Sequence, residues 1–411
     1  MLNGVCKYNA THRFARFKTK SENPTSFRLF ALSCDRPSRL LLGQQNPWLH
    51  MLKHMAPNHR QNVSAVLHIG DQIYPDNEDI ADADKIFSSI FDNLSEHKQK
   101  MMMQRGWELW RNKYRKVFSS EGKVSLMSQV SNLTIWSDND VANDFTTMKN
   151  EDGTQKYHAN FLQCGMRTYR EYQRRLWDPE CSLDLKETID EWHFHVYGSI
   201  GIFMLDLRGN RITGDGVQMS ENPLLSEDQW DDLEEFFKNP DLRAIILCSE
   251  TPFVGDEPSF CKQKVHENFK MDFLRDHWTF NENELIRLLD LCFSWKALGE
   301  NSGVGRDILL IGGDIHCGVT SVIRDEETGL QINHLTTSPV TNHVCKFYPP
   351  LSGNISDRYN FSHLPLGEQF RNYADICIDI GEDDVYIQAK LVPISIDIFK
   401  DKSWESVDDI E

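Results

Sequence analysis

The sequence has no long apolar run: no stretch approaches the roughly 18 consecutive apolar residues that span a membrane. Basic residues are scarce, since 44 Lys and Arg face 62 Asp and Glu, which gives a net charge of -18. Nucleic-acid grooves and anionic membranes attract Lys and Arg, so neither is expected as a partner. The ten cysteines form no C-x-x-C pair, which leaves a zinc ribbon or a thioredoxin motif unsupported.

Targeting features are scarce as well. The first 20 residues carry five Lys and Arg but no apolar core of signal-peptide length. Together with unpaired cysteines, this predicts a cytoplasmic protein. With 40% hydrophobic and 26% charged residues and no internal repeat, the 411 residues are expected to hold one large domain over 27–395. A polar basic arm, 1–26, precedes this domain, and an acidic tail, 396–411, follows it.

Two apolar runs that end in Gly-Asp are the strongest signal in the chain. Residues 66–69 precede Gly70-Asp71, and residues 308–311 precede Gly312-Gly313-Asp314. Continuous apolar runs of this length are typical of buried parallel strands. Open α/β folds place their sites at the carboxyl ends of such strands, so both aspartates are expected at one shared site. The hypothesis is a binuclear metal centre for phosphoester chemistry.

The remaining elements are predicted from periodicity and turn residues. Strands are expected at 27–32, 66–69, 133–136, 243–248 and 308–311, with a strand pair within 194–207 and hairpins within 320–336 and 375–391. Helices are expected at 47–54, 79–118, 161–177, 226–238 and 283–295, and the segment 254–279 is expected to be irregular. The order of these elements favours a layered α/β domain with a parallel sheet.

Four strand ends offer metal ligands. They are Cys34 with Asp35, Asp71 with Tyr74, Asp138 with Asn139 and Asp140, and Asp314 with His316. Two cations need an anion between them, and Asp71, placed by the tight turn at Gly70, is the candidate bridge. This mixture of carboxylate, imidazole, thiolate and phenolate suits iron beside a second divalent ion. Taken alone, a Gly-Asp pair is usually a turn, and Cys34 is either a ligand or a small buried hydrophobe.

Six motifs, in this order, carry a family resemblance. They are Ser33-Cys34; Gly70-Asp71-Gln72-Ile73-Tyr74-Pro75-Asp76; Trp136-Ser137-Asp138-Asn139-Asp140; Leu205-Asp206-Leu207-Arg208; Leu225-Ser226-Glu227-Asp228-Gln229-Trp230; and Gly313-Asp314-Ile315-His316. Over residues 27–340 the chain resembles the PhoD-like (alkaline phosphatase D) branch of the calcineurin-like metallophosphoesterases. The resemblance implies an α/β sandwich of two mixed β-sheets flanked by helices, which replaces the parallel sheet and assigns the late hairpins to the second sheet.

The resemblance also implies the roles of individual residues. The metal ligands would be Cys34, Asp71, Tyr74, Asp138, Asp314 and His316. Cys34, Asp71 and Tyr74 would bind an iron-type ion, and Asp71 would bridge to a second ion, often calcium, with Mn, Mg or Zn as other options. Asp138 would hold that second ion, while Asp314 and His316 are not divided between the two. A metal-activated hydroxide would hydrolyse a small phosphomonoester or phosphodiester.

Two further residues are candidates for contact with the substrate. Arg208 either clamps a phosphate oxygen or holds a structural salt bridge. The family's third motif reads Trp-Asp-Asp-His-Glu, and its histidine is Asn139 in this chain. Asparagine can hydrogen-bond a phosphoryl oxygen but cannot act as a titrating acid, a role typically worth about 10²–10⁴ in rate. His277, His334 or His343 either supplies the proton instead or is an ordinary histidine.

Three functional hypotheses follow. The first is a metal-dependent phosphoester hydrolase. The second, motivated by Asn139 and Ser137, is a degenerate relative that binds a phosphorylated ligand or a protein partner without efficient turnover. The third is another α/β enzyme whose strand-end aspartates are only turns. His68 is expected to pack inside its strand, and Cys248 is expected to be structural.

Overall fold

The structure is a computed structural model that describes residues 24–40, 44–55, 62–75, 85–87, 91–146, 159–185, 190–212, 223–345, 351–364 and 370–394. The predicted arm lies outside these ranges apart from residues 24–26, and the predicted tail, 396–411, lies wholly outside them. The predicted domain boundaries therefore stay predictions. Within the described ranges, no helix is long and apolar enough to cross a membrane.

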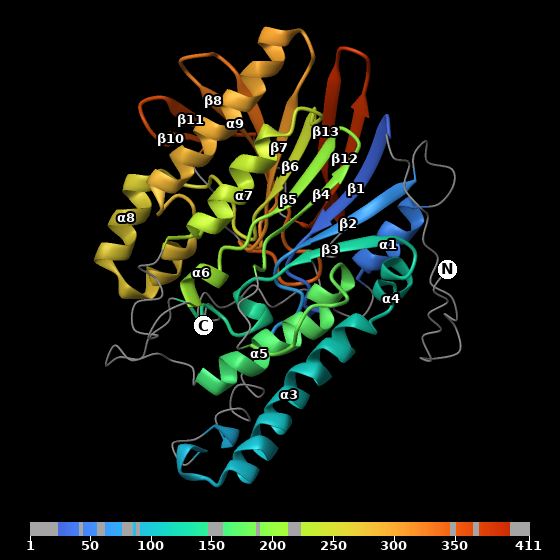
Figure 1. The fold of residues 1–411 in the computed structure, drawn as a ribbon, viewed down its shortest axis with the longest axis vertical. Helices are drawn as coiled ribbons and strands as arrows, with labels where there is room; N and C mark the ends of the chain where they lie inside the picture. The colour runs from blue at the N-terminus through green and yellow to red at the C-terminus, as the bar shows by residue number, and fades with distance from the viewer. Residues whose placement is uncertain are drawn as a thin grey trace.

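Two mixed β-sheets face each other in the centre of the molecule (Figure 1). The first has five strands in the order β13-β12-β1-β2-β3. Its parallel half consists of β1 (Ser26–Leu32), β2 (Val63–Ile69) and β3 (Ser131–Ile135). Its antiparallel half consists of β12 (Arg371–Ile380) and β13 (Val385–Ile394), which complete the sheet next to β1.

The second sheet has eight strands. In spatial order they are β10 (Ser352–Asn354), β11 (Tyr359–His363), β8 (Val319–Asp325), β9 (Gln331–Thr336), β7 (Asp307–Gly312), β6 (Ala244–Cys248), β5 (Ile200–Met204) and β4 (His193–Tyr197). The four strands β5, β6, β7 and β9 run parallel, and antiparallel strands lie on both sides of them. The prediction of two mixed sheets is confirmed, and the expectation of a parallel sheet was wrong because hairpins extend both parallel cores.

The last hairpin lies in a different sheet from the one expected. The hairpin β8–β9 belongs to the second sheet as predicted, but β12 pairs with β1, with Ala31 opposite Ala374. In Figure 1 the red β12 and the blue β1 therefore lie side by side, although they come from opposite ends of the chain. The alternation that predicted this hairpin specifies which face is buried, but it does not specify the neighbouring strand.

The strand β1 shows why the central strands are apolar throughout. Successive side chains of a strand point to opposite faces, and here both faces are covered. Leu29 and Ala31 join the core between the sheets, while Phe30 and Leu32 pack on the other face with Trp48. Trp48 lies in α1 (Pro47–His54), which begins at Asn46 because the Asn46 side chain accepts a 2.9 Å hydrogen bond from the Trp48 backbone N–H.

Helices flank the two sheets. They are α3 (Glu96–Phe118), α4 (Lys123–Met127), α5 (Ala159–Tyr172), α6 (Gly209–Ile212), α7 (Glu227–Lys238), α8 (Pro258–Glu267) and α9 (Glu282–Ser302). α7 and α9 lie against the second sheet (Figure 1). The core between these helices and the sheet is separate from the core between the two sheets. The segment 254–279 was wrongly expected to be irregular: it contains α8, started by a proline, and a 3-10 helix over Phe269–Asp276.

Candidate metal centre

Strand ends from both sheets meet at one place. Cys34 follows β1, Asp71 follows β2 and Asp138 follows β3, while Asp314 follows β7 of the second sheet. Parallel strands deliver the residues after their carboxyl ends to the same edge of a sheet. Because the two sheets face each other, both edges contribute side chains to a single cluster.

Four of the residues in this cluster have a strained backbone. The φ angles are 58° at Cys34, 57° at Asp71, 68° at Asp314 and 52° at His316. This left-handed region is uncommon for residues other than glycine, and such strain concentrates at functional sites. The conformation turns the chain sharply at the strand ends, which allows ligands from separate strands to converge.

The cluster consists of two sets of possible metal ligands that share one carboxylate. Cys34, Asp71 and His316 form one set, and Asp71, Asp138 and Asp314 form the other. Within each set the ligand atoms lie within 4.8 Å of one another. The Asp71 Oδ1 atom is buried and accepts no hydrogen bond from any described residue. A carboxylate that belongs to both ligand sets and has one oxygen without a hydrogen bond fits a metal-bridging role, so the residues present fit the metals that the resemblance implied.

Tyr74 lies beside the first set. Its hydroxyl donates a 2.6 Å hydrogen bond to Asp71 Oδ2 and lies 3.1 Å from His316 Nε2. The Cys34 sulfur lies 3.5 Å from the same Asp71 oxygen and accepts a 3.0 Å hydrogen bond from the Ser338 hydroxyl. The structure therefore brings together all six residues that were predicted to bind metal.

The electrostatics of the cluster favour a bound cation. Burial, followed by the charges of Asp138 and Asp314, raises the pKa of Asp71 well above its usual range. Burial and the charge of Asp138 likewise raise the pKa of Asp314, and burial raises the pKa of the Cys34 thiol. These acids crowd together where their ionised forms are disfavoured, and bound cations would reverse that preference.

Asp140 lies outside both ligand sets, although its strand end was predicted to offer ligands. Its Oδ2 atom accepts hydrogen bonds from the backbone N–H groups of Asp71, at 3.0 Å, and Ser137, at 2.9 Å. Its Oδ1 atom accepts from the backbone N–H of Gln72 at 3.0 Å and from the Gln173 side chain at 2.7 Å. Asp140 therefore ties the turn after β2 to the turn after β3 and holds Asp71 in place.

Gly70 allows these two turns to approach each other. Its φ is 74°, and a Cβ atom at this position would lie 2.7 Å from the Ser137 Cβ and 3.2 Å from the Glu250 Cβ. A larger residue would push the turns apart, so glycine is required on both conformational and steric grounds.

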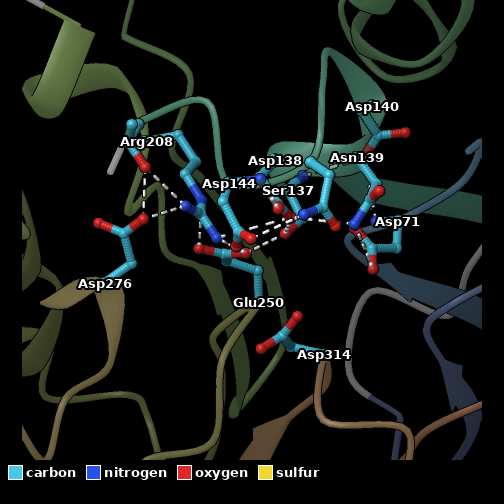
Figure 2. Close-up of polar contacts among 12 residues, drawn as sticks. Asp71, Ser137, Asp138, Asn139, Asp140, Asp144, Arg208, Glu250, Asp276 and Asp314 are labelled. Carbon is cyan, nitrogen blue, oxygen red and sulfur yellow. Dashed lines mark hydrogen bonds and ion pairs between the residues drawn. The ribbon is translucent and has the colours of Figure 1, made fainter. Parts of the chain in front are cut away.

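Asn139 lies beside two carboxylates of the cluster. Its side-chain nitrogen lies 3.5 Å from Asp71 Oδ2 and 3.4 Å from Asp138 Oδ1, and the residue is buried. The amide therefore borders the second ligand set, where the family motif has its histidine. Figure 2 shows its side chain between Asp71 and Asp138.

Arg208 lies beside the second ligand set in a network of buried charges (Figure 2). Its guanidinium pairs with Glu250, with Nε 2.7 Å from Oε1, and with Asp276, with Nη1 2.5 Å from Oδ2. A third nitrogen, Nη2, lies 3.7 Å from Asp138 Oδ1. Arg208 therefore makes the structural salt bridges that were one of its two predicted roles.

The three candidate histidines lie in different places. His334 is fully buried in β9, where its Nε2 accepts a 3.4 Å hydrogen bond from the Phe253 backbone N–H. The Nε2 of His343 lies 3.3 Å from the Nδ1 of His316. His277 directs its Nε2 toward Asp314, 3.5 Å from Oδ2. Burial lowers the pKa of His277 to about 4, so this contact is made by a neutral imidazole and is no ion pair.

Two other residues singled out in the sequence, His68 and Cys248, lie in the interior of the protein. His68 lies in β2, fully buried, with its ring nitrogens 2.9 Å from the Gln72 side chain and 3.0 Å from the Asn132 side chain. Cys248 is buried at the end of β6, and burial raises the pKa of its thiol. Both side chains pack in the interior, as expected.

Sequence reasoning missed three acids at the site. Glu250 and Asp276 hold Arg208, and the backbone N–H of Asp144 donates a 2.6 Å hydrogen bond to Asp138 Oδ2. Glu250 directly follows the apolar run of β6 and Ser249, so the strand-end criterion used for Asp71 would have found it. Asp276 ends a 3-10 helix and Asp144 lies in a turn, so the strand-end criterion identifies neither of them.

The two-sheet α/β fold and the cluster of candidate metal ligands at its strand ends are those expected of the phosphoester hydrolases that the sequence resembles. The model of the PhoD-like phosphatase family matches residues 29–365, and the chain belongs to that family. A solved structure described as "Structure of PhoD" is similar in fold, with a TM-score of 0.54 and 12% identity over 92% of this chain and 74% of that chain. Among curated proteins, none matches the chain significantly.

Proposed function

We propose that this member of the PhoD-like phosphatase family hydrolyses a small phosphomonoester or phosphodiester at a binuclear metal centre. The observation that supports the proposal is the pair of ligand sets that share Asp71, with its orphaned Oδ1 atom. Two cations close together require a bridging anion, and a shared carboxylate supplies it.

The same geometry supports a division of the ligands between two metals. We assign His316 to the set with Cys34 and Asp71, next to the Tyr74 hydroxyl, and we propose that this set holds an iron-type ion. Thiolate, imidazole and phenolate ligands suit such a metal. We assign Asp314 to the all-carboxylate set, which suits calcium, with Mn, Mg or Zn as alternatives.

When bound, the two metals would activate a water for in-line attack on phosphorus and would neutralise charge on the phosphoryl oxygens. Residues of the chain supply the remaining interactions. The contacts of the Asn139 amide with Asp71 and Asp138 support a role as hydrogen-bond donor to a phosphoryl oxygen. The contacts of Arg208 with Glu250 and Asp276 favour a role in holding the Asp138 side of the site, and its role as a phosphate clamp stays a prediction.

Asn139 also determines which substrates suit the site. An amide cannot transfer a proton to a leaving oxygen, so alkoxide leaving groups would be disfavoured. Phenolic, enolic and phosphoanhydride leaving groups need less protonation. We therefore expect substrates with such leaving groups to be hydrolysed faster than alkyl phosphates.

The proposal is tested by metal analysis of protein purified without chelator, together with turnover of an aryl phosphate. Asp71→Asn removes the bridging charge and is expected to abolish turnover and to lower the bound metal. Asp231→Asn, the same change at an exposed position of α7, is the matched control and should leave both unchanged. Protein without bound metal that gains no activity with iron, calcium or manganese would contradict the proposal.

The second candidate is a degenerate phosphatase-like protein that binds a phosphorylated ligand or a protein partner without efficient turnover. Asn139 motivates it. Asn139→His separates the two: a large rate gain would indicate an impaired centre, whereas equal rates would show that Asn139 suits the native chemistry. Tight binding of a phosphorylated ligand without hydrolysis would favour the second candidate.

The expected partner is a small phosphorylated substrate. The net charge of -18 gives no reason to propose a nucleic-acid ligand. The cytoplasmic location stays a prediction from the sequence.

A further inference from the structure

His277 is the only one of the three candidate histidines that borders the all-carboxylate ligand set. Its Nε2 atom lies 3.5 Å from Asp314 Oδ2, whereas His343 contacts His316 of the other set. Asn139 borders the same set from the side of Asp71 and Asp138. The imidazole and the amide therefore lie at different carboxylates of one cluster.

The backbone of His277 is anchored on both sides. Asp276, before it, pairs with Arg208 and with Arg211, whose Nη1 lies 2.9 Å from Oδ1. Trp278, after it, is fully buried, and its Nε1 donates a 2.9 Å hydrogen bond to the Ser249 hydroxyl. Groups that bind substrates work best when neighbouring contacts hold them in position, and His277 meets this condition.

The Nε2 atom of His277 is still available to another acceptor. A separation of 3.5 Å lies beyond the usual range of a strong hydrogen bond, and the side chain is 12% exposed. An imidazole can donate a hydrogen bond from Nε2 both as the Nε2–H tautomer of its neutral form and in its charged form.

We propose that His277 is a substrate-contacting residue that donates a hydrogen bond to a phosphate oxygen bound at the all-carboxylate set. It thereby supplies, from a segment far from Asn139 in sequence, the imidazole that the third motif lacks. This inference rests on the proposed phosphoester site. The proposed role differs from that of a positioning residue, in which His277 would orient Asp314 without touching the substrate.

The first experiment measures binding of inorganic phosphate to metal-loaded protein by calorimetry, so it does not depend on turnover. His277→Ala should weaken phosphate binding by about tenfold to a hundredfold, the usual effect of losing a hydrogen bond to a charged group. Metal content should not change. His266→Ala, at an exposed position of α8, is the matched control and should bind phosphate like the wild type.

A second pair of variants separates contact from positioning. His277→Gln keeps an N–H donor and should retain part of the affinity. Adding Asn139→His to His277→Ala should restore phosphate binding, because it returns an imidazole to the site. Unchanged phosphate affinity in His277→Ala, or affinity lost only together with bound metal, would overturn the inference. Wild-type protein that binds phosphate through His277 but hydrolyses no ester would refute the proposed function and leave this inference standing.

Discussion

The hydrogen bonds of Asp140 give a sharp prediction for the variant Asp140→Asn. The Oδ2 atom accepts from the backbone N–H groups of Asp71 and Ser137, and an asparagine has only one oxygen to offer. If the asparagine oxygen keeps the contacts with Gln72 and Gln173, its amide nitrogen points at the backbone N–H groups of Asp71 and Ser137. These two N–H groups then have no acceptor. Each buried N–H without an acceptor costs roughly 1–3 kcal/mol.

The expected loss in the free energy of unfolding is therefore roughly 2–6 kcal/mol, a large part of the about 5–15 kcal/mol typical of a domain. The assay is urea unfolding of metal-free protein at pH 8, followed by tryptophan fluorescence. Asp71→Asn is the control: it removes a ligand and a buried charge but leaves the backbone hydrogen bonds, so stability should hold or rise. Equal urea midpoints for Asp140→Asn and the wild type would refute the reasoning.

Two further predictions concern buried charge. Burial raises the folded-state pKa of Asp140 and Glu250 to about 7 and that of Asp206 to about 6. Between about pH 4 and pH 7 these three carboxyls bind more protons in the folded chain than in the unfolded chain, so their contribution to stability falls as pH rises. Glu250→Gln removes one of these contributions, so the Tm of the metal-free variant relative to the wild type should rise through this window; a difference in Tm that stays constant would contradict it. Lys123→Met leaves the charge of its fully buried partner Asp35 without a counter-ion, and the free energy of unfolding, measured with urea, should fall by about 3–5 kcal/mol. Adding Asp35→Asn should recover part of this loss. An unchanged free energy of unfolding in Lys123→Met would count against a charged pair.

Four of the candidate ligands, Cys34, Asp71, Asp138 and Asp314, could be predicted from the sequence because each lies two or three residues beyond the end of a strand. A buried apolar run specifies where a strand ends, and parallel strands bring their ends together. Asp71 and Asp314 were therefore found as a pair although more than 240 residues separate them. The motif spacing added Tyr74, which lies three residues beyond Asp71.

The partners of Arg208 could not be predicted in this way. Asp276 is the last residue of the 3-10 helix Phe269–Asp276 and follows no strand, and only the folded chain brings it to Arg208. The position of β12 beside β1 depends in the same way on pairing across most of the chain. The short, polar β10 (Ser352–Asn354) gave no pattern that could be recognised in the sequence.

The left-handed conformations at the strand ends have a consequence for how this chain could lose its chemistry. An L-residue in that region costs about 1 kcal/mol or more relative to glycine, which adopts it without penalty. Glycine at Cys34, Asp71, Asp314 or His316 would therefore relieve strain while destroying a ligand. A chain with no use for these ligands would gain stability by the simplest substitutions available to it. This chain has a thiol, two carboxylates and an imidazole at these strained positions, and contacts with a bound ion would offset the conformational cost.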